Sequence, residues 1–165
     1  MPIMATRVDQ KLIHGQVTLG WAPFLGVEEI IVADHPAMDS VLLMDIMASG
    51  VQPPVKDTFF VTPARLPAYL KSRQGQDPRL MILFRDVAGA YEAIQEGFKP
   101  PSLNLGNQFY LTRQETTRLA DSFFVNREDL ETLIALANQG LKIFFQSLPA
   151  DEPVPFDPGR YQWIL

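Results

Sequence analysis

The run Leu80-Met81-Ile82-Leu83-Phe84 is the clearest sign of the fold of this 165-residue chain. Every position in the run is apolar, whereas a strand with one solvated face alternates apolar and polar residues. A polar turn at 74–78 precedes the run, and Asp86 follows it as a cap for a helix from 87 to 96. The pattern predicts a strand that is buried on both faces, as in a parallel sheet covered by helices.

Strand and helix patterns alternate along the rest of the chain. Further strands are predicted at 2–8, 27–33, 58–61, 102–105, 122–125 and 141–145, and further helices at 15–25, 36–49, 64–72 and 127–138. This order predicts an α/β fold with a doubly wound, mainly parallel sheet and helices on both faces. In such a sheet the site lies beyond the carboxyl ends of the strands. We therefore expect His14, Asp34, Asp86 and the segment 104–107 to meet in one shallow, open cleft.

Length and composition fit one domain, residues 1–165, in which 151–165 form a tail that packs on the domain or on a partner. A hydrophobic content of 47% with 20% charged residues is typical of a packed globular protein. The net charge of −5 argues against nucleic acid as a partner. No apolar stretch approaches the roughly 18 residues that span a bilayer, and the chain has neither a signal peptide nor any cysteine. These features predict a cytoplasmic protein.

The stretch RVDQKLIHGQV, residues 7–17, places His14 where a strand gives way to a helix. The first backbone N–H groups of that helix, including those of Gly15 and Gln16, favour an anion. A neutral imidazole is a nucleophile near physiological pH, and Arg7 and Lys11 could hold a phosphoryl group during its attack. The stretch therefore predicts a phosphohistidine site. The alternative is an ordinary histidine at a helix start, capped or solvated.

Other polar residues could support this site. Asp9 could orient the imidazole, or it could simply cap a turn. The segment that contains Asn104, Gly106 and Asn107 could be a loop that offers backbone N–H groups to phosphate, or an ordinary turn. The pair Asp34 and His35 shows no recognised metal-ligand spacing, so no metal site is predicted.

The stretch around His14 resembles the marker of the enzyme IIB component of the mannose/fructose/sorbose family of the bacterial phosphotransferase system. The matching residues are Arg7, Val8, Asp9, Leu12, Ile13, His14, Gly15, Gln16, Val17 and Trp21, and the segments 30–34, 104–106 and 147–151 resemble later parts of the family's sequence. The resemblance implies that His14 accepts phosphate from a IIA phosphohistidine and passes it to a sugar arriving through membrane IIC and IID partners. It implies a phosphotransferase without a cofactor, held at the inner face of the membrane by its partners, and it leaves homo-oligomers open.

The chain departs from the family's pattern at several charged or glycine positions. Lys11 stands where the family usually has Arg, so a planar two-pronged phosphate clamp becomes a point charge. The other departures are Gln10, His35, Asn107 and Gln146. The changes at Lys11, Asn107 and Gln146 favour one alternative, a regulatory IIB-like protein that is phosphorylated without sugar transport. A second alternative is an α/β domain that binds a small molecule without a covalent step, although the chain lacks a GxGxxG or GxxxxGK loop.

Overall fold

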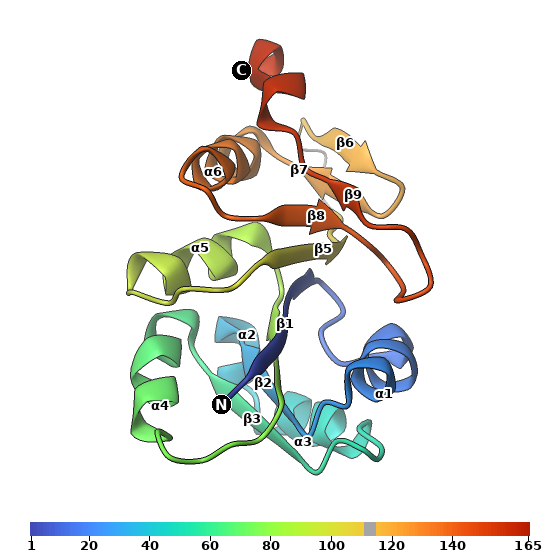
Figure 1. Ribbon diagram of the computed structural model, residues 1–165, viewed down its shortest axis with the longest axis vertical. Helices are drawn as coiled ribbons and strands as arrows, with labels where there is room; N and C mark the ends of the chain where they lie inside the picture. Colours follow the sequence, from blue (N-terminus) through green and yellow to red (C-terminus); the bar gives the residue numbers. More distant parts are fainter. Residues whose placement is uncertain (111–114) are drawn as a thin grey trace.

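A parallel sheet forms the centre of the computed structural model, which describes residues 1–110 and 115–165. Seven strands lie in the order β3-β2-β4-β1-β5-β8-β9 (Figure 1). Every pair is parallel except β8 with β9. The predicted doubly wound, mainly parallel sheet is therefore confirmed. The strands are β1 Ile3–Asp9, β2 Glu29–Ala33, β3 Asp57–Val61, β4 Leu80–Phe84, β5 Leu103–Asn107, β8 Ile143–Phe145 and β9 Val154–Pro155.

Helices cover both faces of the sheet, and each face has its own core. On one face α4 (Leu66–Ser72), α5 (Val87–Gln95) and α6 (Arg127–Asn138) pack against the sheet. On the other face lie η1 (Gln16–Trp21), α1 (Ala22–Leu25), α2 (His35–Met38) and α3 (Val41–Ser49) (Figure 1). Between the two layers all five residues of β4 are fully buried, as its continuous apolar sequence predicts.

Side-chain caps fix where several helices begin. Asp86 accepts a hydrogen bond of 2.8 Å from the backbone N–H of Gly89 at the start of α5. Asn126 and Asp129 form a capping box at the start of α6, which satisfies backbone donors that have no partner inside the helix. Short 3-10 helices complete the described elements at η2 (Pro63–Arg65), η3 (Pro158–Arg160) and η4 (Gln162–Ile164).

Three predicted elements differ from the structure. The segment 104–107 is part of β5 rather than a loop, because β1 and β8 pair with its two edges. The predicted strand 122–125 does not join the parallel sheet: β7 (Phe123–Val125) pairs antiparallel with β6 (Thr117–Ala120) in a separate small sheet. The predicted helix 36–49 is divided at Ser40, whose hydroxyl accepts from the Leu43 N–H at 3.2 Å and starts a new helix.

The C-terminal residues run back along the sheet. β9 pairs with β8, and Phe156 lies in the core cluster, where it stacks on Tyr161 at a centroid distance of 5.4 Å. Trp163 remains 82% exposed. In the two described segments, no helix is both long enough and apolar enough to cross a membrane.

Candidate active site

His14 lies against a buried carboxylate at the end of β1. Its Nε2 is 2.7 Å from Oδ2 of Asp9, and its side chain is 19% exposed. A tight turn brings the two together: the Leu12 N–H donates to the Asp9 carbonyl at 2.9 Å, and Leu12 has a φ of 54°. This left-handed conformation is unfavourable for a branched residue, and burial of the Leu12 side chain in the core helps to hold it. The turn folds His14 back over Asp9.

Three further groups hold the carboxylate of Asp9. Nε of Arg7 lies 3.0 Å from Oδ2, while Nδ2 of Asn107 and the backbone N–H of Lys11 donate to Oδ1 at 2.7 and 3.1 Å. Burial by itself would raise the pKa of Asp9, but the hydrogen bond from His14 and the charge of Arg7 outweigh it and lower that pKa. The carboxylate is thus ionised and can only accept hydrogen bonds. Nε2–H of His14 is therefore the donor to this carboxylate, and in the neutral imidazole the lone pair is then on Nδ1.

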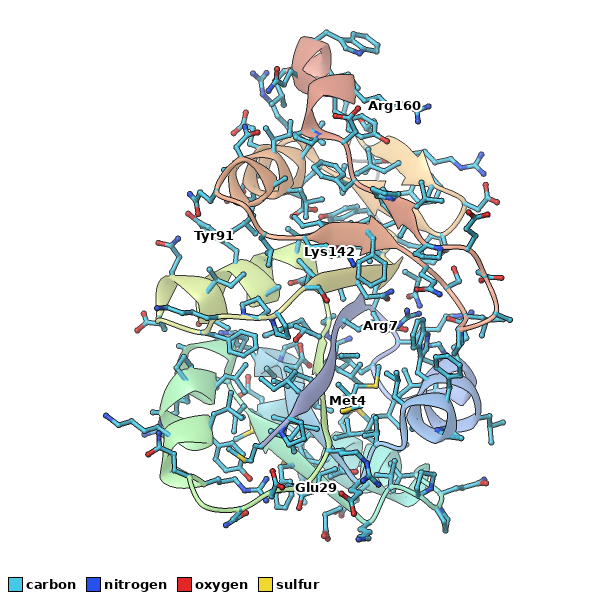
Figure 2. The ribbon with its side chains drawn as sticks, viewed as in Figure 1. Met4, Arg7, Glu29, Tyr91, Lys142 and Arg160 are labelled. Carbon is cyan, nitrogen blue, oxygen red and sulfur yellow. The ribbon has the colours of Figure 1, made fainter. Side chains whose placement is uncertain are left out.

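Arg7 lies near the centre of the molecule (Figure 2), where it is fully buried and its guanidinium has no free donor. All five of its N–H groups have protein acceptors, and burial lowers its pKa. Nε donates to Asp9; Nη1 donates to Oδ1 of Asn104 and to the Gln146 carbonyl; Nη2 donates to Oε1 of Gln16 and to the Ser147 carbonyl. The expectation that Arg7 holds the phosphoryl group therefore changes. Arg7 instead holds Asp9 in place.

The β5 residues serve this buried arginine and the carboxylate rather than forming a phosphate loop. Asn104 binds Arg7, and Asn107 binds Asp9. A Cβ at Gly106 would lie 2.2 Å from Cζ of Arg7, so only glycine leaves space for the guanidinium. The predicted nest of backbone N–H groups is replaced by side-chain contacts, because the β5 backbone is paired in the sheet.

The groups that remain to bind an anion are Lys11 and the N–H groups of Gly15 and Gln16, on the outer, solvent-facing side of His14. Lys11 is exposed, and its ammonium makes no ion pair within the described residues. Gly15 is also exposed, and the helix that follows it begins beside the imidazole, since Val17 and Thr18 donate their N–H groups to the His14 carbonyl at 2.9 Å. The N–H groups of Gly15 and Gln16 precede these bonds, where a helix leaves its donors free.

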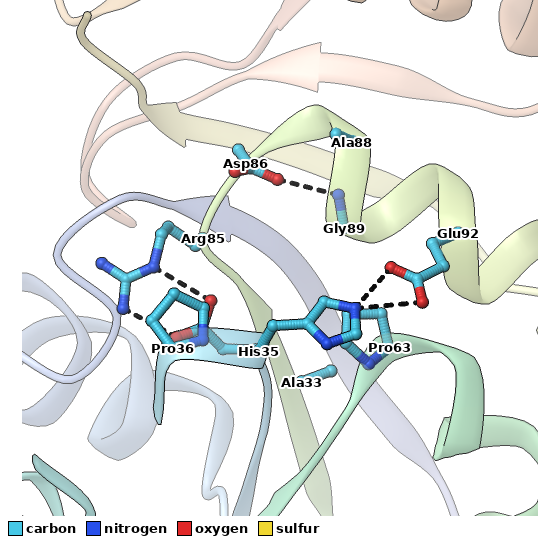
Figure 3. Close-up of a pocket in the computed structure, with 10 residues that line it drawn as sticks. Ala33, His35, Pro36, Pro63, Arg85, Asp86, Ala88, Gly89 and Glu92 are labelled. Atoms are coloured by element: carbon cyan, nitrogen blue, oxygen red, sulfur yellow. Dashed lines mark hydrogen bonds and ion pairs between the residues drawn. The ribbon is translucent and has the colours of Figure 1, made fainter. Parts of the chain in front are cut away.

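Asp34 and Asp86 lie in a neighbouring pocket of about 200 Å³ at the same edge of the sheet (Figure 3). Asp34 accepts from Arg85 at 2.9 and 2.7 Å, and Asp86 caps α5. In the same pocket, Nε2 of His35 lies 2.8 Å from Oε2 of Glu92. No hydrogen bond or ion pair between described residues connects these groups to His14. Asp34 and Asp86 thus lie at the sheet edge where they were expected, but each is held by a partner of its own, Arg85 and the start of α5.

Two main-chain acceptors of the site were not predicted from the sequence. The carbonyls of Gln146 and Ser147 accept from Arg7, and the Ser147 carbonyl also accepts from Nε1 of Trp21 at 2.9 Å. A main-chain acceptor has no side-chain signature, so only the family-like segment 147–151 pointed to this turn. Among the described residues, no group of three or more His, Asp or Glu is arranged to hold a metal ion.

Comparison with known proteins identifies one family. Residues 3–159 match the sequence model of the PTS system sorbose subfamily IIB component. The PTS system mannose-specific EIIAB component of Escherichia coli K12 is 28% identical over 152 residues, covering 92% of this chain and 46% of that protein. The PTS system fructose-specific EIIB component of Bacillus subtilis is 25% identical over 161 residues, covering 94% of each chain. The chain thus spans about half the length of the first of these relatives and nearly all of the second.

Solved structures show the same fold. The IIBSor domain of the sorbose permease from Klebsiella pneumoniae superposes with a TM-score of 0.83 at 23% identity, covering 93% of each chain. The N-acetylgalactosamine-specific IIB component 1 from Escherichia coli gives a TM-score of 0.84 at 19% identity, covering 94% of this chain and 99% of that one.

Proposed function

We propose that this chain, which belongs to the sorbose-subfamily IIB components of the phosphotransferase system, carries a phosphoryl group on Nδ1 of His14. The observation behind the proposal is the 2.7 Å contact between Nε2 of His14 and Oδ2 of Asp9. Because the carboxylate accepts a hydrogen bond from Nε2–H, Nδ1 is the ring nitrogen with a lone pair in the neutral imidazole. The buried contacts of Arg7 keep the carboxylate in place.

In the accepting step, the Nδ1 lone pair attacks the phosphorus of a IIA phosphohistidine. The P–N bond to Nδ1 forms as the P–N bond of the donor breaks, and the electron pair stays with the donor's imidazole. No proton leaves His14, because Nδ1 carries none and Nε2 keeps its proton, which it donates in the hydrogen bond to Asp9. The positive charge of the phosphorylated ring then lies beside a carboxylate. Lys11 and the N–H groups of Gly15 and Gln16 stabilise the phosphoryl oxygens.

In the passing step, a sugar hydroxyl presented with the membrane IIC and IID partners attacks the same phosphorus. The P–Nδ1 bond breaks, the electron pair returns to Nδ1, and the hydroxyl proton passes to solvent. Nothing in this sequence requires a cofactor. A carrier must offer its imidazole to two proteins in turn, and a partly exposed His14 suits that task. In this proposal residues 1–165 act as one domain in the cytoplasm, held at the inner face of the membrane by its partners.

The test is to incubate the protein with phosphoenolpyruvate, the general phosphotransferase proteins and a IIA protein of this family, and to measure acid-labile phosphate. The parent should be labelled, and His14→Ala should abolish the label. His35→Ala is the matched control, because His35 also lies beside a carboxylate, that of Glu92, but in the neighbouring pocket. Labelling that persists in His14→Ala contradicts the proposal. An unlabelled parent would favour a domain that binds its ligand without a covalent step.

The regulatory alternative is separated by a second measurement. Labelled protein is mixed with membranes that contain the IIC and IID components and with the candidate sugars mannose, fructose and sorbose. Formation of sugar phosphate supports transport, whereas label that stays on the protein supports regulation. Of the departures from the family's pattern, Asn107 gives the least support to the regulatory alternative. Its side chain adds a hydrogen bond to Asp9 rather than removing a phosphate contact.

A further inference from the structure

Arg85 shares one face of the sheet with Asp9, next to the phosphoacceptor. Val8, Phe84 and Ala33 are paired in register on the adjacent strands β1, β4 and β2, and all three side chains lie in the core on the α5 side. Side chains alternate along a strand, so the next residues, Asp9 and Arg85, project to the opposite face. Neighbouring strands are roughly 4.8 Å apart. Arg85 therefore occupies the position beside Asp9, the residue that holds His14.

The segment that carries His14 crosses the same face. Leu12 packs in one core cluster with Val32 and Leu83, which lie just before the ends of β2 and β4. Figure 3 shows the Arg85 guanidinium on the side of the pocket away from α5. The guanidinium that Asp34 holds thus lies at the edge of the sheet where the segment that bears the phosphoacceptor crosses.

The donors of Arg85 are only partly used, in contrast with those of Arg7. Nε and Nη2 form a fork on the two oxygens of Asp34, at 2.9 and 2.7 Å. Asp34 is itself buried and is held by the Ala37 N–H at 2.9 Å. The remaining N–H groups, two on Nη1 and one on Nη2, have no acceptor within the described segments. The Arg85 side chain is 30% exposed, so an incoming group can reach this free edge.

A phosphoryl group on His14 brings up to two negative charges and three acceptor oxygens to this place. The planar edge of a guanidinium binds two such oxygens at once, whereas the Lys11 ammonium offers a point charge. Arg7 cannot contribute, because its donors are all bound. We propose that Arg85, oriented by Asp34, is the arginine that contacts the phosphoryl group on His14. The inference rests on the proposed function.

Phosphoramidate is the suitable donor for a test, because this small molecule phosphorylates histidine without docking of a IIA protein. The measurements are the rate at which His14 is labelled and the pKa of the bound phosphoryl group, both followed by phosphorus NMR. Arg85→Ala should slow labelling by about tenfold to a hundredfold, the effect of one lost hydrogen bond to a charged group. It should also raise the phosphoryl pKa, because a neighbouring cation favours the doubly ionised form.

Two further variants test the geometry. Arg85→Lys should recover only part of the rate, and Asp34→Asn should give a smaller loss than Arg85→Ala because the guanidinium remains but is less well oriented. The matched control is Arg79→Ala, which removes an arginine paired with Glu28 just before β4, at the opposite end of the same strand. This control should label at the parental rate. Urea unfolding of each variant verifies that it is folded.

Parental labelling and an unchanged phosphoryl pKa in Arg85→Ala would overturn the inference and leave the proposed function intact. So would a variant that is slow with a IIA donor but normal with phosphoramidate, because Arg85 would then bind the donor protein instead. A parent protein that takes no phosphate on His14 from either donor would overturn the proposed function, and this inference with it.

Discussion

Substitution of Gly106 by alanine should destabilise the protein strongly, although the change adds only one methyl group. The new Cβ would lie 2.2 Å from Cζ, 2.3 Å from Nη2 and 2.6 Å from Nε of Arg7. The end of a long side chain usually moves aside at little cost. Here the guanidinium is buried and hydrogen-bonded on every side, so it cannot shift without breaking its contacts with Asp9 and Asn104.

Two effects set how far Gly106→Ala lowers the free energy of unfolding. Overpacking a core costs about 1–3 kcal/mol, and breaking a buried ion pair costs about 3–5 kcal/mol because the partner charge stays buried. If the Gly106→Ala methyl displaces the guanidinium, Asp9 keeps its charge without its arginine. We therefore expect the free energy of unfolding to fall by about 3–5 kcal/mol, a large part of the roughly 5–15 kcal/mol typical of a native domain.

Urea unfolding followed by tryptophan fluorescence measures this loss. Trp21 is buried, with its ring centre 5.4 Å from Cζ of Arg7, so its emission reports on the site. The exposed Trp163 is the only other tryptophan, and Trp163→Phe removes its background. Gly20→Ala is the control, since a Cβ there meets its nearest neighbours at an ordinary 3.6 Å.

The decisive comparison repeats Gly106→Ala in an Arg7→Ala background, which lacks the guanidinium that the new methyl group would meet. The second substitution should then cost little, so that nearly all of the loss of about 3–5 kcal/mol appears as coupling energy between the two positions. A loss below about 1 kcal/mol for Gly106→Ala alone would be the size of an ordinary surface change and would refute the reasoning. The same would follow if the full loss persisted without Arg7.

The remaining predictions concern His14 and its neighbours. Lys11→Ala should slow labelling of His14 by about tenfold, while Lys11→Arg should keep or raise the rate; a parental rate in Lys11→Ala would make the lysine a solvated surface residue. Phosphate should sit on Nδ1 of His14, as nitrogen-proton NMR correlations can show, and phosphate on Nε2 would contradict the role of Asp9 as acceptor of the ring proton. Because the pKa of Asp9 is lowered in the folded state, its contribution to stability should be complete above about pH 4 and be lost as the pH falls further. Urea midpoints measured across that range should decline less steeply in Asp9→Asn, and an equal decline would exclude Asp9 as the group responsible.

The sequence predicts the sheet because burial on both faces leaves a local signature. β4 is apolar at each of its positions, and caps such as Asp86 and Asn126 mark helix starts within a few residues. The segment 104–107 shows the limit of this reasoning. Asparagine and glycine favour turns, but pairing with strands on both sides overrides that preference. Such pairing depends on segments far away in the chain, which no local pattern reveals.

The same limit explains why sequence reasoning placed Asp9 beside His14 yet assigned Arg7 a different role. Asp9 and His14 are separated by one short turn, so their contact follows from local geometry. Asp9 and Gln16 are nearby acceptors of Arg7, but its other acceptors come from β5 and from the turn that contains Gln146 and Ser147, more than 90 residues away. Only the folded chain shows that these acceptors occupy every donor of the arginine.

The departures at Lys11, Asn107 and Gln146 can now be separated by what each side chain contacts. Asn107 donates to Asp9, and the Gln146 side chain donates to the Asp151 carbonyl at 2.8 Å while its own carbonyl accepts from Arg7. Both residues therefore build the support beneath the imidazole and remove no group that faces the phosphoryl oxygens. Lys11 alone changes a group on that outer side. Among these three departures a weakened transfer step is expected from Lys11, and the free edge of Arg85, in the role proposed above, would compensate for it.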